Sequence, residues 1–465
     1  MTSACRRPLS PRRRGHKAAF AAAVGFALTM ASGLDAQTLE EALTSAYLTN
    51  PEIVSQRAAL RATDELVPIA KSGWRPTINV VSDATYSDID GSVGGGETFS
   101  TSNSLSIQQN LYEGGATVAN TRRAERLVRV ERAQLTTVEQ DILLDAATAY
   151  TGLLNDLAVL ELAFQNENRL KRQLRATKDR FEVGEVTRTD VAQAEASLAG
   201  AISERINASG TIDASRATFR NVIDLEPESL IPPQPLENLP ASESEAQQLA
   251  EAINPSILAA QFNLAAARED VAVAESALLP SLSANGDLNY TDEPSTSLDW
   301  QRSASIGATL TVPLYQGGAE YAQVRQNKET VRQLKSDLDA VYRAVREEVT
   351  AAWQALVTTR ASIESIAEQV RAAEIALEGS RQEALVGQRT TLDVLDQEND
   401  LFQAEVDLVS AQRDEIVASY RLKAAVGELT AEGIDLPIEP YDIEANYKNV
   451  RSRWFGLGSD PDDER

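Results

Sequence analysis

The chain has 465 residues, 69 Asp and Glu against 44 Lys and Arg, and a formal net charge of −25 at pH 7, an acidic balance that repels nucleic acid. Its single Cys, its single His and both Met lie within the first 36 residues, at Cys5, His16, Met1 and Met30. Beyond them the chain has no thiol and no imidazole, which excludes disulfides, Cys- or His-ligated metal sites and most nucleophilic or general-base catalysis.

Residues 1–36 are predicted to be a secretory signal peptide. Basic residues precede an apolar run from Ala18 to Ala31, and a region of small residues ends near Ala36. The run is too short to span a bilayer, which needs about 20 residues. Cys5 precedes the run, so no lipid-modified N-terminus is expected. Without this segment the chain has 38 basic and 68 acidic residues and a net charge of about −30.

The remaining chain contains an internal duplication, in which matching segments lie 203 to 204 residues apart. They are Asn50-Pro51 with Asn254-Pro255, Leu111–Ala116 with Leu314–Ala319, and Val183-Gly184 with Val386-Gly387. Because the period is far longer than that of solenoid repeats, each copy is expected to be a half-molecule. Repeat one spans residues 37–225 and repeat two residues 243–429. The Pro-rich residues 226–242 are predicted to link them, and residues 430–465 to form an irregular tail.

Each repeat is predicted to contain a leading helix, two strands and a long helical hairpin. Between Gly115 and Phe181 there is no Pro, and apolar residues recur at spacings of three and four, which is typical of a helix. At 1.5 Å per residue this helix would reach ~100 Å, so it needs a partner along its length. The partner helices are predicted at residues 187–221 and 390–427, each after a Val-Gly turn whose Gly suits the left-handed conformation.

Two extended segments precede each long helix. In repeat two, apolar residues alternate with Ser, Gly and Thr from Ser303 to Leu314, and a hairpin partner is predicted from Leu282 to Tyr290. In repeat one, strands are expected near residues 78–86 and 105–107, joined by a Gly-rich loop. The predicted strand-to-helix turns contain Gly114, Gly115, Gly317 and Gly318.

The strand lengths suit transmembrane strands of roughly 9 to 11 residues. Four strands are too few to close a barrel, so their outer edges would remain unpaired in a membrane. A membrane barrel would therefore require several copies of the chain, with 4n strands for n copies. The alternative is that two β-hairpins cap a soluble helical bundle.

The chain resembles the TolC-type outer-membrane efflux protein family of Gram-negative bacteria over essentially its whole mature sequence. The resemblance rests on the duplication, on the Leu-Tyr-x-Gly-Gly turn after each second strand, and on the stretch from Val386 to Asp396. It implies a mainly α fold with a transmembrane β-barrel, in which a homotrimer closes a 12-stranded barrel in the outer membrane and long helical hairpins form a periplasmic cylinder. It also implies an export channel for drugs or secreted proteins, without enzymatic activity, cofactor or metal. The implied partners are a periplasmic adaptor protein and an inner-membrane drug pump or ABC secretion transporter.

The resemblance also assigns roles to residues of the hairpin tips. The repeat-two hairpin would be the gate, with Asp393 and Asp396 as its acidic constriction and Asp400 on the same helix face. Arg389 would latch this hairpin to Thr189 and Asp190 of repeat one. Ala384 stands where the family often has a Tyr, so one lock contact is expected to be absent or replaced. Adaptor docking would involve Val183, Gly184, Val186, Thr187, Val386, Gly387 and Thr390.

Local structure offers an alternative for several of these roles. Thr187 with Asp190 and Thr390 with Asp393 both fit a helix capping box, and the tip residues also fit simple turns. The acidic stripe that continues through Asp407 and Asp414 could be an ordinary solvated face. At the level of the whole protein, the alternative is a periplasmic helical scaffold without a pore. An enzyme is less favoured, because only a carboxylate pair could serve as its catalytic groups.

Overall fold

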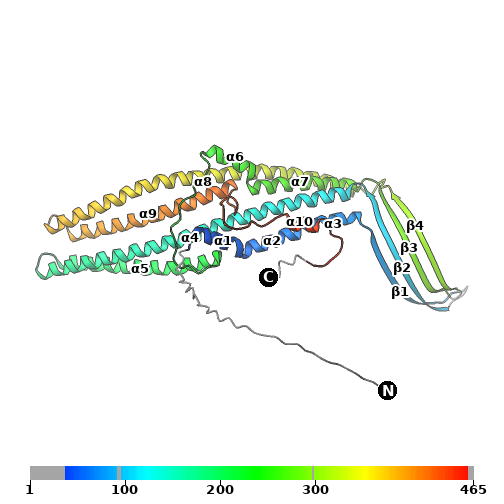
Figure 1. Cartoon of the computed structure of the whole chain (residues 1–465), viewed down its shortest axis with the longest axis horizontal. Helices are drawn as coiled ribbons and strands as arrows, with labels where there is room; N and C mark the ends of the chain where they lie inside the picture. Colours follow the sequence, from blue (N-terminus) through cyan, green and yellow to red (C-terminus); the bar gives the residue numbers. More distant parts are fainter. Residues whose placement is uncertain (1–36, 92–95, 296–297, 459–465) are drawn as a thin grey trace, which may run out of the picture.

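The computed structural model describes residues 37–91, 96–295 and 298–458. The predicted signal peptide, residues 1–36, lies outside the described residues. The molecule is elongated, with four long helices running side by side and a four-stranded sheet projecting from one end (Figure 1). None of the helices in the described ranges has both the length and the apolar character needed to cross a membrane. The predicted fold class, mainly α with four strands per chain, is confirmed.

The two repeats have matching elements. Repeat one contains α1 (Leu39–Thr49), α2 (Pro51–Asp64), α3 (Leu66–Lys71), the 3-10 helix η1 (Ser72–Trp74), β1 (Thr77–Ile89), β2 (Gly96–Glu113), α4 (Ala116–Glu182) and α5 (Arg188–Ile223). Repeat two contains α6 (Glu243–Ile253), α7 (Pro255–Ser276), β3 (Ser281–Ser295), β4 (Leu298–Thr311), α8 (Ala319–Leu385) and α9 (Thr391–Val426), and α10 (Ala445–Val450) follows. Helices α4 and α8 have 67 residues each, and α5 and α9 have 36 each, so the hairpins have matching lengths.

The repeated Asn-Pro pair divides each leading helix in two, which the sequence analysis did not predict. Asn50 ends α1 and caps α2, and its side-chain oxygen accepts a hydrogen bond from Glu52 N at 2.9 Å. Its amide nitrogen donates to Val222 O at 3.2 Å, near the end of α5. Asn254 makes the equivalent bond to Ala425 O at 2.9 Å. The pair therefore joins each leading segment to the end of its own hairpin, and Pro suits the first helical position because it has no N–H to satisfy.

The four strands form one antiparallel sheet in the order β1-β2-β3-β4. The central strands, β2 of repeat one and β3 of repeat two, pair with each other. Each repeat therefore has one strand edge that is covered by the other repeat. The strands of 13, 18, 15 and 14 residues are longer than expected. The predicted continuation of the last strand to Leu314 is wrong, because β4 ends at Thr311 and Pro313 cannot donate a ladder hydrogen bond.

The two faces of the sheet differ in polarity. Side chains alternate between faces along a strand, and the register places apolar residues opposite one another on one face. These are Ile78, Ile107 and Ile306, and in the next row Val80, Leu105, Leu288 and Ala304. The row between them, on the other face, is polar and consists of Asn79, Ser106, Asp287 and Ser305. Several of the apolar side chains, including Ile306 and Val80, are exposed in the single chain.

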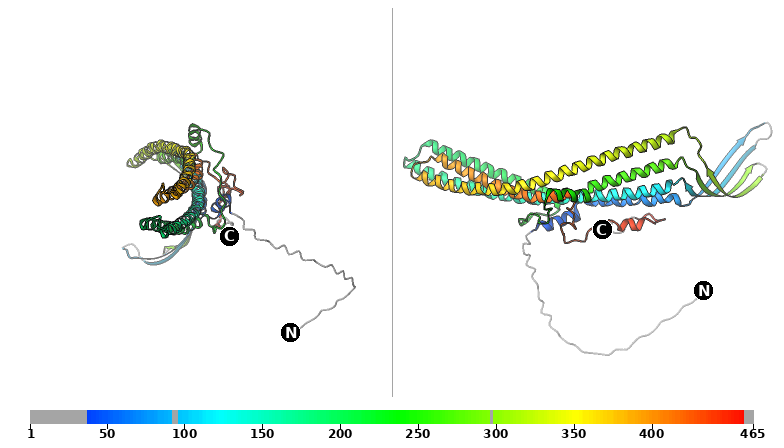
Figure 2. Two further views of the ribbon diagram at one scale, coloured as in Figure 1. Left: turned by 90° about the vertical axis from the view of Figure 1, so that its left-hand side faces the viewer. Right: turned by 90° about the horizontal axis from the view of Figure 1, so that it is seen from above.

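The helices form a curved layer, with α1, α6 and the C-terminal segment, residues 428–458, on its convex side (Figure 2). The largest apolar core joins α1, the middle of α4, the end of α5 and the C-terminal segment. Tyr150 is buried in this core, where its hydroxyl oxygen lies 2.7 and 2.8 Å from the backbone oxygens of Gln37 and Ile231 and can donate its one proton to either. The same oxygen accepts a hydrogen bond from Ile231 N at 3.0 Å. Gln37, which precedes α1, and Ile231 of the inter-repeat linker are thereby held together beside α4.

The C-terminal segment is more ordered than the sequence predicted, since it contains α10 and packs along α2, α3 and α4. Arg57 lies between the rings of Tyr47 and Tyr441, 4.7 and 4.9 Å from their centroids. Asn446 donates to the buried Asp64 at 2.8 Å. Tyr441 and Asn446 lie hundreds of residues from Arg57 and Asp64 along the chain, so local patterns could not reveal this packing.

Candidate functional site

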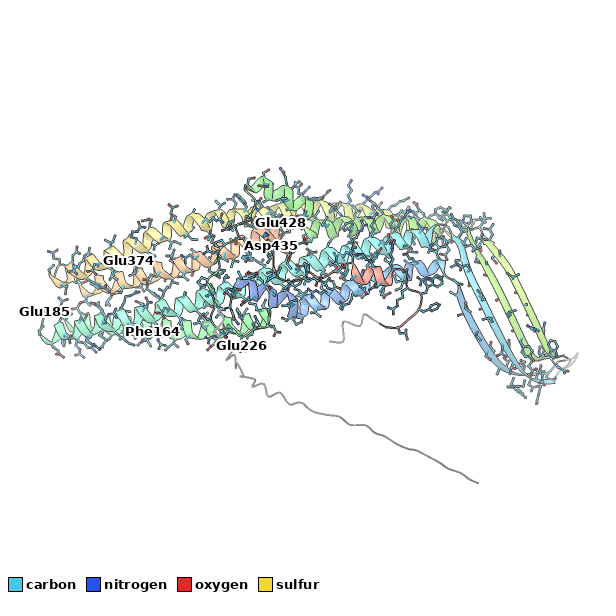
Figure 3. The ribbon with its side chains drawn as sticks, in the orientation of Figure 1. Phe164, Glu185, Glu226, Glu374, Glu428 and Asp435 are labelled. Carbon is cyan, nitrogen blue, oxygen red and sulfur yellow. The ribbon has the colours of Figure 1, made fainter. Side chains whose placement is uncertain are left out.

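The two hairpin tips lie together at the end of the molecule opposite the sheet, and Figure 3 shows Glu185 at the tip of the first. Both tips turn at a Gly with left-handed backbone, φ +83° at Gly184 and +75° at Gly387, a conformation that costs other residues energy. Glu185 N donates to Arg180 O and Gln388 N to Glu383 O, both at 2.9 Å. The turns are therefore built alike in both repeats.

The tip residues named for docking are mostly exposed. Val183 and Val386 have exposed fractions of 72% and 71%, and Gly184, Thr187, Gly387 and Thr390 are also exposed, while Val186 is half-buried. Exposed valines beside a turn present apolar surface without a partner in the described part of the chain.

Both predicted capping boxes are present. Thr187 N donates to Asp190 Oδ2 at 2.7 Å, and Asp190 N to Thr187 Oγ1 at 3.3 Å. The corresponding distances for Thr390 and Asp393 are 2.9 and 3.2 Å. Hydrogen bonds from the Thr187 side chain and backbone lower the pKa of Asp190, and those from the Thr390 backbone and side chain lower the pKa of Asp393. Both carboxylates are thus held ionised at the starts of α5 and α9.

The ion pairs at the two tips have opposite polarity. In repeat one Arg180 Nε lies 3.0 Å from Glu185 Oε2, whereas in repeat two Arg389 Nε lies 2.9 Å from Glu383 Oε2. Glu383 is the counterpart of Arg180, 203 residues on. The hydrogen bond to Glu383 raises the pKa of Arg389. Within the described residues the predicted contact of Arg389 with Thr189 or Asp190 is not formed, so it would have to replace the Glu383 pair or involve another copy of the chain.

The acidic residues of α9 are differently placed. Asp393 is half-buried, and Asp396 and Asp400 are exposed. Asp400 accepts a hydrogen bond from Gln397 at 3.3 Å, while Asp396 has no hydrogen-bond or ion-pair partner in the described ranges. An exposed carboxylate without a partner remains available to solution or to a neighbouring copy.

Sequence reasoning missed a charged group that connects the two hairpins, formed by Arg169 of α4, Arg381 of α8, and Glu398 and Glu405 of α9. Glu398 is only 1% exposed, and its Oε2 lies 3.2 Å from Arg169 Nε. Its other oxygen accepts a hydrogen bond from Arg381 Nη2. Arg169 Nη2 lies 3.1 Å from Glu405 Oε2. Arg169 therefore joins the repeat-one hairpin to the repeat-two hairpin. Within one described chain, Arg389 makes no such contact with Thr189 or Asp190.

A sequence signal for part of this group existed. Arg381 and Glu398 correspond to Lys178 and Glu195 at the repeat offset, and those two are also paired, at 2.7 Å. The repeat-one pair is half exposed, at 50% and 52%. The counterpart of Arg169 is Ala372. In the ion pairs between the two hairpins, repeat one therefore supplies the arginine and repeat two the carboxylates, and repeat two has no arginine at the equivalent position.

Ala384 faces the interior of the second hairpin. It is buried in a small apolar cluster with Leu377, Val394 and Leu401. In this hairpin a side chain that packs α8 against α9 thus occupies the position where the family often has a Tyr.

The strand-to-helix turns lie at the opposite end. Gly114 has φ +62°, and a Cβ there would lie 2.5 Å from the backbone oxygen of Ser276. Gly115 and Gly318 are the N-cap residues of α4 and α8, and Gly317 precedes Gly318 with φ +76°. Among the described side chains no cluster of three or more His, Cys, Asp or Glu is arranged to hold a metal ion.

The comparisons with known proteins cover both repeats. The family model described as "Outer membrane efflux protein" matches residues 42–223 and 246–428. The chain is 38% identical over 442 residues to the outer membrane efflux protein BepC of Brucella suis biovar 1, covering 94% of this chain and 96% of the relative. It is 26% identical over 434 residues to the outer membrane protein TolC of Escherichia coli, covering 88% and 86%. The Campylobacter jejuni CmeC outer membrane channel has a similar structure, with a TM-score of 0.76 at 16% identity and 89% of each chain covered.

Proposed function

This chain belongs to the outer membrane efflux protein family, and from that premise we propose that three copies form one duct through the outer membrane and periplasm. At the level that membership establishes, the protein is a non-enzymatic outer membrane channel for efflux or secretion, with a helical periplasmic part. The trimer, the gate and the partners are the proposed steps beyond that level.

The observation that carries the proposal is the amphipathic four-stranded sheet, whose outer strands β1 and β4 each have one neighbour within the described chain. Unpaired strand edges are not tolerated in a bilayer, so β4 of one copy would pair with β1 of the next. Three copies give the 12-stranded barrel. The face bearing Ile78, Val80 and Ile306 would contact lipid, and the face bearing Asn79, Ser106 and Asp287 would line the water-filled lumen.

The helical hairpins would continue the duct into the periplasm. At 1.5 Å per residue the 67 residues of α4 and of α8 extend ~100 Å. A curved layer of long helices, as seen in Figure 2, suits one third of a cylinder wall.

The proposed gate is the α8–α9 hairpin. In the closed state Asp393, Asp396 and Asp400 of three copies would gather at a constriction, and their negative potential would favour cations over anions. Outward movement of this hairpin must break the contacts of Arg169 with Glu398 and Glu405, and any latch that Arg389 forms with Thr189 or Asp190. Opening then depends on separating buried and exposed ion pairs together.

The proposed partners engage the tips. A periplasmic adaptor protein would dock on the exposed Val183 and Val386 and the adjacent turn residues, and an inner-membrane drug pump or ABC secretion transporter would supply energy and select the substrate. A photo-crosslinker placed at Val386 should capture an adaptor in cells, whereas one at the exposed Ile375 of α8 should not. Equal capture at both positions would contradict tip docking.

Conductance of the purified full-length protein in planar lipid bilayers tests the proposed function. Stepwise, cation-selective currents are expected. A protein that migrates as a folded oligomer but gives no steps would favour the alternative, a periplasmic scaffold without a pore.

A further inference from the structure

A hollow of about 450 Å³ lies where η1 leads into β1, on the side covered by the C-terminal segment. Its charged lining is entirely basic: Lys71, Arg75, Arg122 and Arg451 contribute to it together with Trp74 and Trp454. No carboxylate lines it. Four cations around one hollow are notable in a chain whose mature net charge is about −30.

The positive charge of this hollow is only partly neutralised. Arg451 Nη2 lies 3.1 Å from Glu125 Oε1. Arg75 stacks over Trp454, with its guanidinium carbon 4.8 Å from the ring centroid, and Arg122 has no ion pair within the described ranges. Burial, with the charges of Arg451 and Arg75, lowers the pKa of Lys71. The hollow is thus a site where an added anion would relieve repulsion between like charges.

Exposed apolar side chains lie next to the hollow. Trp454, Phe455 and Leu457 are all exposed, Phe455 to 87%. The segment that carries them is held in place, because Lys71 Nζ donates to Arg451 O at 3.3 Å and Arg132 pairs with Glu444 at 3.4 Å. Basic side chains beside exposed aromatic ones are the combination that suits a membrane–water interface.

The position of the hollow agrees with such an interface. It lies at the helix-side end of the sheet, and the C-terminal segment that covers it runs on the convex side of the helical layer (Figure 2). If the sheet spans the outer membrane, this end of it meets the periplasmic leaflet, whose lipids carry phosphate headgroups.

The duplication supplies an internal comparison. The counterparts of Lys71, Trp74 and Arg75 in repeat two are Glu275, Leu278 and Leu279. Glu275 pairs with Lys328 at 2.8 Å, so the equivalent place is neutralised without an added ion. The basic hollow is therefore not a requirement of the fold, which repeat two builds without it.

We propose that this hollow binds the phosphate of an anionic phospholipid in the periplasmic leaflet, with Trp454, Phe455 and Leu457 lying among the headgroups and upper acyl chains. The proposal rests on the membrane placement of the sheet in the proposed function. Arg75 and Arg122 contact the phosphate, Arg451 and Lys71 add to the local positive potential, and each chain binds one lipid.

Native mass spectrometry of the full-length protein in detergent, with added phosphatidylglycerol or phosphatidylcholine of the same acyl chains, tests the proposal. We expect one retained phosphatidylglycerol per chain and much weaker retention of phosphatidylcholine. Arg75→Gln/Arg122→Gln should reduce the affinity for phosphatidylglycerol about tenfold or more, since each juxtamembrane cation contributes substantially to binding anionic lipid. The matched control Arg332→Gln/Arg371→Gln removes two exposed arginines from α8 and should leave the affinity unchanged.

Equal retention of both lipids, or equal loss in the two double variants, would overturn the proposal. The result is separable from the test of the channel. A protein that conducts normally but shows no preference for phosphatidylglycerol refutes only the lipid site, and one that selects the lipid without conducting counts only against the channel.

Discussion

Replacing Glu398 by Gln tests whether the buried ion pairs between the hairpins hold the gate closed. The substitution keeps the size of the side chain and removes its charge, leaving Arg169 and Arg381 without their shared carboxylate. We expect the α8–α9 hairpin to separate from α4 more readily, because Glu398 is the buried centre of the contact between them.

The expected free-energy cost of Glu398→Gln follows from the burial of this ion pair. Removing one partner of a buried pair typically costs about 3 to 5 kcal/mol. Two features reduce that range: Arg169 keeps Glu405 at 3.1 Å, and the side chain of Arg381 is 38% exposed, where ion pairs contribute only about 0 to 1 kcal/mol. We therefore expect about 1 to 3 kcal/mol per chain. A shift of about 2 kcal/mol changes an equilibrium about thirtyfold.

The assay is single-channel recording in planar bilayers, together with thermal unfolding of the purified protein. Glu398→Gln should increase the open fraction or the conductance. Glu195→Gln is the matched control, since Glu195 makes the corresponding pair with Lys178 in repeat one but is half exposed and carries no bridge between hairpins. Equal effects of the two variants, or unchanged currents in a folded Glu398→Gln protein, would refute the reasoning.

Three further predictions concern the tips and the C-terminal packing. Arg389→Ser should increase conductance, because the latch loses its cation; an unchanged single-channel current would count against a latch at this residue. Asp393→Ala/Asp396→Ala should weaken cation selectivity and block by multivalent cations, and an unaltered reversal potential in a salt gradient would contradict a carboxylate constriction. Burial raises the pKa of Asp64 above its usual 3.8, so the folded state holds the carboxyl proton more tightly than the unfolded state. The resulting stabilisation of the folded state is fully present below pH 3.8 and is lost as the pH rises through the folded pKa. Asp64→Asn removes that dependence, so melting temperatures of the two proteins should diverge as the pH rises; a constant difference across pH would show that Asp64 does not titrate in this way.

Much of the fold was predictable because its signals are local or periodic. The capping boxes at Thr187 and Thr390 depend on residues three apart, and the tip turns on single glycines. The long helices follow from apolar spacing and the absence of Pro. The strand boundaries were predicted less accurately. The predicted last strand continues to Leu314, whereas β4 ends at Thr311, before Pro313.

The candidate site was predicted only in part. The tip residues lie where the sequence placed them, but the contacts of Arg389 with Thr189 and Asp190 stay a prediction, since this chain pairs Arg389 with Glu383. The bridge from Arg169 to Glu398 and Glu405 was missed. A local pattern can show that Glu398 is charged and lies on a helix, yet it cannot show that a side chain from another hairpin covers it.

The sequence by itself therefore determined the duplication, the lengths of the hairpins, the places where they turn and the alternation of the strands, since these depend on neighbours a few residues apart or on a comparison of the two copies. The tertiary structure decided which of two equivalent ion pairs is buried, how the C-terminal segment packs on α2 to α4, and that four cations converge beside β1. Burial and local potential depend on groups brought together from distant parts of the chain. Two copies with the same local pattern can consequently differ in the burial of equivalent ion pairs, and the proposed division into a fixed wall and a movable hairpin rests on that difference.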